Sequence, residues 1–88
     1  MNLPPETRRQ KAVRLCSTGR VLVHADTPTI AVATVEGDHG TYTVSISAPD
    51  RYTCTCDWAR YGRASERPCS HVLALAHATQ RYVRDPHD

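Results

Sequence analysis

Large side chains are scarce in this chain, which has no phenylalanine, one tryptophan and one methionine among its 88 residues. A chain of this length buries only about 60% of the surface that its unfolded form exposes. With so few large apolar residues, the core alone supplies little stability. Small domains of this kind usually depend on a metal ion or on disulfides.

Long apolar runs are also missing, so no segment of the sequence is suited to span a bilayer. Residues 1–19 are polar and rich in arginine, and they lack the apolar centre of a signal peptide. We therefore expect a cytoplasmic protein with no membrane partner. Thiols stay reduced in that compartment, so the four cysteines favour metal ligation over a disulfide framework.

Three of the four cysteines fall into a metal-binding pattern. Cys54 and Cys56 flank one residue, twelve residues follow, and Cys69 and His71 again flank one residue. Three thiols and one imidazole are the ligands of a closed tetrahedral zinc site. The spacing predicts Cys54 and Cys56 on one face of a strand, because alternate side chains point the same way. It predicts Cys69 just before a helix and His71 in its first turn.

Other uses of these residues stay open at this point. A Cys54–Cys56 redox pair, a Cys69–His71 nucleophile pair and His77 as a rival fourth ligand are the alternatives to a Cys₃His site. Cys16 lies outside the pattern and is expected to be a small buried residue of a helix. Four protein ligands leave zinc no open position for a substrate, so we expect one structural zinc and no enzyme.

Periodicity predicts an α+β fold with helices at both ends of an antiparallel meander of three to four strands. An N-terminal helix is expected over residues 5–18, with Gly19 as its C-terminal cap. The C-terminal helix begins near Ser70, and its apolar stripe would pack on the sheet. The stripe consists of Val72, Leu75, Ala76, Thr79 and Val83. The strands are expected over residues 20–25, 30–35, 41–47 and 52–56, and a polar loop over residues 57–68.

The cysteine and histidine pattern, together with the strand before it, resembles the SWIM-type zinc finger. The resemblance runs from about Tyr42 to Ala76, and it extends toward Arg20; local features match in residues 42–46, 53–58 and 68–74. By this resemblance Cys54, Cys56, Cys69 and His71 would be the four ligands. It implies that Trp58 packs near the finger. SWIM modules are thought to bind DNA or proteins, and small free-standing forms resemble accessory proteins of bacteria and phages. We expect one domain, divided into a helix (1–19), the finger (20–84) and a tail (85–88).

Basic residues suggest where a partner would bind. Ten of the eleven basic residues are arginines, whose planar fork suits phosphate, although a GC-rich genome would produce the same bias. The formal charge of +2 falls to about +1 once zinc and three thiolates are counted. The candidate contacts are Arg8, Arg9, Lys11 and Arg14 in the first helix and Arg60, Tyr61, Arg63 and Arg67 in the loop.

Two functions follow from these contacts. The first is binding of nucleic acid, DNA in particular, with low sequence specificity, where aromatic rings stack on bases and arginines meet phosphates. The second is a protein-interaction adaptor for a cellular or host complex, favoured by the near-neutral charge of the zinc-bound form. In that case the basic residues are a solvated surface and Trp58 belongs to the core. Neither function needs a small-molecule substrate.

Overall fold

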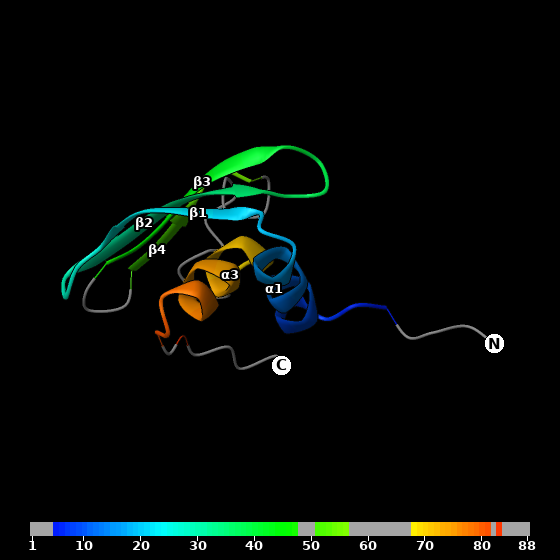
Figure 1. Ribbon diagram of the computed structural model, residues 1–88, viewed down its shortest axis with the longest axis horizontal. Helices are drawn as coiled ribbons and strands as arrows, with labels where there is room; N and C mark the ends of the chain where they lie inside the picture. Colours follow the sequence, from blue (N-terminus) through cyan, green and yellow to red (C-terminus); the bar gives the residue numbers. More distant parts are fainter. Residues whose placement is uncertain (1–4, 48–50, 57–67, 82, 84–88) are drawn as a thin grey trace.

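The chain folds into a four-stranded antiparallel sheet with two helices on one of its faces (Figure 1). The computed structural model describes residues 5–47, 51–56, 68–81 and 83. The elements in chain order are α1 (Arg8–Ser17), β1 (Val21–Asp26), β2 (Ile30–Glu36), β3 (Thr41–Ser47), β4 (Arg51–Cys54) and α3 (Ser70–Ala78). The predicted α+β class, with a helix at each end of an antiparallel meander, is confirmed.

Helix α1 begins at Arg8, three residues after the start at residue 5 that the sequence analysis predicts. Thr7 is its N-cap and accepts a hydrogen bond from the backbone N–H of Gln10, whose side chain accepts one from the N–H of Thr7. This capping box satisfies two backbone donors that the helix itself leaves unpaired. At the other end Gly19 has φ +72°. The N–H groups of Gly19 and Arg20 donate to carbonyls of the last turn, which is the glycine cap that the sequence predicts.

Strands β2 and β3 form the centre of the sheet and pair in register from Ile30 opposite Ser47 to Glu36 opposite Thr41. Their inner face is apolar and includes Ala31, Ala33, Val35, Val44 and Ile46, all of them buried. Strands β1 and β4 are the two edges of the sheet. The pairing of β1 with β2 shifts register at His24, where a bulge bends the edge.

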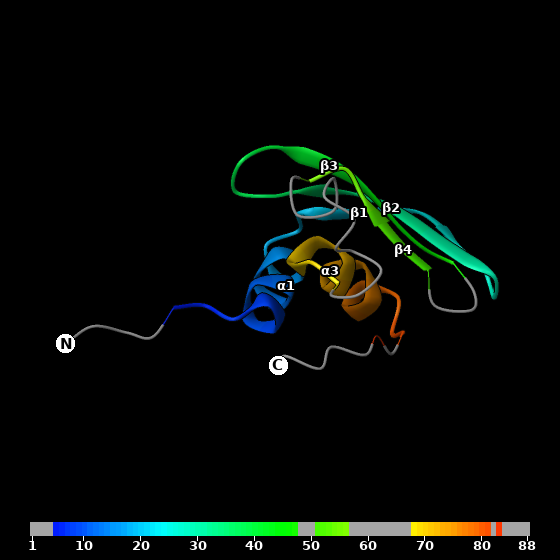
Figure 2. The same cartoon turned by 180° about the vertical axis from the view of Figure 1, so that it is seen from behind.

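Helix α3 packs on the sheet with α1 beside it (Figures 1 and 2), and it contacts all four strands as well as α1. The predicted stripe is confirmed: Val72, Leu75, Ala76 and Val83 are buried and Thr79 is half-buried. Leu73 and Ala74, which lie off the stripe, are buried as well, so the helix is covered on a second face. The second covered face packs against α1, whose Leu15 is completely buried.

The C-terminal end of α3 is tied to the sheet by Arg81. Its guanidinium donates to Asp26 Oδ1 at 2.6 Å and also to the carbonyl of Thr27, in the turn that joins β1 to β2. Between the two helices, the Cys16 thiol of α1 donates to the carbonyl of Ala74 in α3 at 3.1 Å.

Neither of the two helices in the described segments has the length and apolar character needed to cross a membrane.

Candidate metal centre

The four residues of the predicted metal site meet where β4 ends and α3 begins. Cys54 is the last residue of β4, Cys69 is the N-cap of α3 and His71 lies in its first turn. Cys56 was expected on the strand with Cys54, but β4 ends at Cys54 and Cys56 follows in a bend. The chain turns there so that the Cys56 side chain still joins the cluster. A shared strand face is therefore not what brings the two sulfurs together.

The donor atoms of the cluster lie close enough together to surround one zinc ion. All four lie within 4.8 Å of one another. His71 Nδ1 is 3.7 Å from the Cys54 sulfur and 3.8 Å from the Cys69 sulfur. Zinc–sulfur bonds of about 2.3 Å and zinc–nitrogen bonds of about 2.0 Å put such pairs roughly 3.6 Å apart in a tetrahedron. The residues therefore fit one zinc ion, with Nδ1 as the imidazole ligand.

Hydrogen bonds within the cluster favour the thiolate at Cys69. A hydrogen bond from the Cys54 thiol holds the pKa of Cys69 well below its usual range, and His71 and the backbone N–H of Val72 add to the effect. The same hydrogen bond, together with burial, raises the pKa of Cys54. Without metal the two thiols thus share a proton, which zinc has to displace because it binds thiolates.

The far side of the His71 ring is covered by two residues that the sequence did not single out. The Tyr42 ring packs on His71 with centroids 4.4 Å apart, and Gly37 lies beside the Nε2 atom. A β-carbon at position 37 would stand 2.7 Å from His71 Nε2 and 2.8 Å from the Tyr42 ring. Only glycine fits there, so the turn between β2 and β3 holds the imidazole in place. Gly37 was visible in the sequence only as a turn residue.

The Nε2 atom of His71 is buried and has no hydrogen-bond partner among the residues that the structure describes. When Nδ1 binds zinc, Nε2 carries the ring proton. Contact with Gly37 and Tyr42, rather than a hydrogen bond, therefore orients this ring. The orientation of His71 thus depends on packing.

The other candidate ligands do not join the cluster. His77, the rival fourth ligand, is exposed at the end of α3 and is not part of the group of donors. His24 lies on β1, where its Nε2 is 2.6 Å from Thr34 Oγ1. Cys16 is half-buried between the helices, and burial raises the pKa of its thiol. It takes the packing position that the sequence analysis expected.

The basic residues of α1 are partly engaged within the protein. The Arg14 guanidinium contacts Glu6 and Asp38, each at 2.9 Å, and its hydrogen bonds lower the pKa of both carboxyls. Lys11 pairs with Asp38 at 3.6 Å, and Arg9 donates to the carbonyl of Val83 at 3.2 Å. Arg14 thus joins α1 to the turn between β2 and β3.

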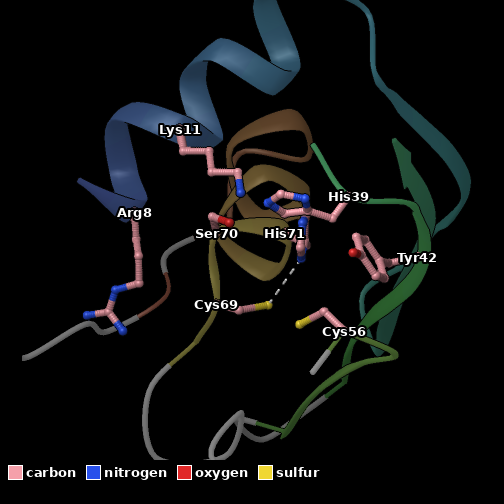
Figure 3. A pocket seen from close by; sticks show the side chains of 8 residues that line it. All are labelled: Arg8, Lys11, His39, Tyr42, Cys56, Cys69, Ser70 and His71. Carbon is pink, nitrogen blue, oxygen red and sulfur yellow. Dashed lines mark hydrogen bonds between the residues drawn. The ribbon is translucent and has the colours of Figure 1, made fainter. Parts of the chain in front are cut away.

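A cavity of about 360 Å³ opens between α1 and the metal cluster (Figure 3). Its walls are Arg8, Lys11, His39, Tyr42, Cys56, Cys69, Ser70 and His71. The remaining candidates, Arg60, Tyr61, Arg63 and Arg67, lie outside the described residues, as does Trp58. Their proposed contacts stay predictions.

Comparison with known families agrees with the geometry. Residues 42–80 match the family model of the SWIM zinc finger, and this segment contains all four donors of the cluster. No curated protein and no solved structure matches the chain. The resemblance seen in the sequence is confirmed. The family match and the Cys₃His cluster together support one structural zinc in a binding module.

Loss of one ligand should release the metal and unfold the protein. Structural zinc contributes about 10–16 kcal/mol of apparent binding energy, which exceeds a typical domain stability of about 5–15 kcal/mol. We expect Cys69→Ser and His71→Ala to purify with far less zinc and to lose cooperative thermal unfolding, as chelator-treated protein should. Elemental analysis and circular dichroism measure both effects. Cys16→Ser is the matched control and should keep its zinc; a ligand variant that stays metallated and folded would contradict the assignment.

Adding a methyl group at position 37 should weaken zinc binding through His71. Loss of support around a ligating histidine typically costs about 10–100-fold in metal affinity, and we expect Gly37→Ala to fall in that range. Competition with a chromophoric chelator measures the affinity. Gly40→Ala is the control, because its β-carbon would lie no closer than 3.5 Å to any atom, although its φ of +158° strains the same turn. Equal zinc affinities for the two variants would show that Gly37 does not position His71.

Proposed function

We propose that this SWIM zinc finger is a non-enzymatic module that binds nucleic acid, DNA in particular, through the phosphate backbone with little sequence specificity. One observation supports this proposal above others. Arg8 and Lys11 of α1 line the same cavity as Cys56 and Cys69. These two cysteines lie beside the two ends of segment 57–67, which contains the other predicted contacts.

The two groups of predicted contacts are far apart in the sequence, one in α1 and one in segment 57–67. The metal cluster brings together Cys56 and Cys69, which flank that segment, and both cysteines line the same cavity as Arg8 and Lys11 of α1. A phosphate backbone passing over the metal centre would meet arginines from both groups. Arginine and lysine contacts of this kind position a nucleic acid without reading its sequence.

The proposed module needs no catalytic step. Four protein ligands complete the coordination of zinc, so the ion has no position at which to bind and polarise a substrate. Affinity for nucleic acid is expected to fall with salt, because each phosphate contact releases counterions. The role of zinc is to hold the basic segments in place.

The salt dependence of DNA binding tests the proposal. Each phosphate contact contributes about 0.9 to the slope of log affinity against log salt on duplex DNA. We expect the zinc-loaded protein to bind duplex DNA at low salt and the double variant R60Q/R63Q to lose about two units of slope. Fluorescence anisotropy over a salt series gives these values.

Arg51→Gln is the matched control for charge. Arg51 is exposed at the start of β4, in register with Ser47 and outside the cavity wall. It should change the slope far less than the loop variant does. Failure of the wild-type protein to bind single- or double-stranded DNA at low salt would falsify the proposal.

A second function is favoured by the edge of the sheet. Strand β1 is an edge strand, and exposed apolar side chains lie on it and at the start of β2. Leu22 is 63% exposed, and Val23 and Ile30 are each 38% exposed. An exposed edge can accept an extended segment of another protein as an added strand. A defined protein partner that survives nuclease treatment and is lost in Leu22→Ser would favour this adaptor role.

A further inference from the structure

We propose that the cavity between α1 and the metal centre is a binding pocket for a single phosphate group. The inference rests on the proposed function and deepens it, because it names the place where one backbone phosphate would be held. The pocket combines two cations of α1, the turn between β2 and β3, and the first residues of α3. Its volume of about 360 Å³ leaves ample room for one phosphate.

Ser70 is the first reason to expect a ligand. Its side chain lines the cavity, yet the residue is only 8% exposed. The hydroxyl makes no hydrogen bond to any described residue. Figure 3 shows it pointing into the same space as the Lys11 side chain. The hydroxyl itself is accessible from the cavity, so it can donate to a ligand that enters there.

The start of α3 strengthens the preference for an anion. Cys69 is the N-cap of α3, but its side chain does not form a regular side-chain capping hydrogen bond. The backbone N–H of Val72 instead points to the Cys69 sulfur and favours its thiolate form. The first turn of a helix also carries partial positive charge, which favours negative groups nearby. Ser70 is the first residue of that turn, so its hydroxyl lies where an anion is stabilised.

The charged residues around the pocket also favour an anion. Arg8 and Lys11 line it, and Arg14 and Arg20 lie around Asp38, which Lys11 also contacts. Lys11, Arg14 and Arg20 thus share the carboxylate of Asp38, and Arg14 also pairs with Glu6. The Lys11–Asp38 pair is long and partly exposed, and such pairs are weak. A phosphate can therefore compete for Lys11.

Titration with inorganic phosphate tests the pocket directly. We expect amide resonances of Lys11, His39 and Ser70 to shift in ¹⁵N-labelled, zinc-loaded protein, at constant ionic strength. Loss of one charge-assisted hydrogen bond should weaken phosphate binding about tenfold in Lys11→Gln. Ser70→Ala should also weaken it, and this variant changes no charge. Arg51→Gln is the matched control, and zinc content is checked for every variant.

DNA titrations of the same variants separate this proposal from the proposed function. Parallel losses of phosphate and DNA affinity in Lys11→Gln and Ser70→Ala, with Arg51→Gln unaffected, would support the pocket. If DNA binds but phosphate shifts none of these resonances, or shifts exposed basic residues all over the surface, the pocket is refuted and the function stands. If phosphate binds in the pocket but DNA does not bind, the pocket stands for another phosphorylated ligand and the nucleic-acid function fails.

Discussion

The Cys₃His cluster is the constraint on which the rest of the structure depends. It joins the end of β4 to the beginning of α3, with donors from both within 4.8 Å of one another. Helix α3 in turn contacts every strand and α1, so fixing its first turn fixes the centre of the molecule. A core built largely from alanine and valine, without phenylalanine, has little apolar area with which to hold these elements unaided. We therefore expect the bound zinc to supply much of the free energy that holds them together.

The turn between β2 and β3 extends this constraint to the rest of the chain. Gly37 allows the turn to approach His71, and Tyr42 covers the imidazole from the start of β3. One residue further along the turn, Asp38 pairs with Lys11 and Arg14 of α1. A single turn therefore contacts a zinc ligand on one side and the N-terminal helix on the other. The position of α1 beside the metal centre follows from this arrangement.

The basic residues of α1 divide into two roles because of that geometry. Arg14 is held by two carboxylates and joins elements of the fold, whereas Arg8 and Lys11 line the cavity beside the zinc ligands. The basic residues of α1 therefore do not form one continuous surface for binding a partner. Arg8 and Lys11 share the cavity with Cys56 and Cys69, the two zinc ligands that flank segment 57–67 in the sequence.

The sequence by itself determined the class of fold, the metal cluster and the bounds of β3, because ligand spacing and strict alternation are local properties of the chain. It placed the start of α1 wrongly, since Thr7 and Gln10 form a stronger helix start than two prolines do. Only the tertiary structure decided that α3 is covered on two faces and that Gly37 contacts His71. Both depend on which distant segments pack together, and a periodic pattern within one segment has no information about its neighbours.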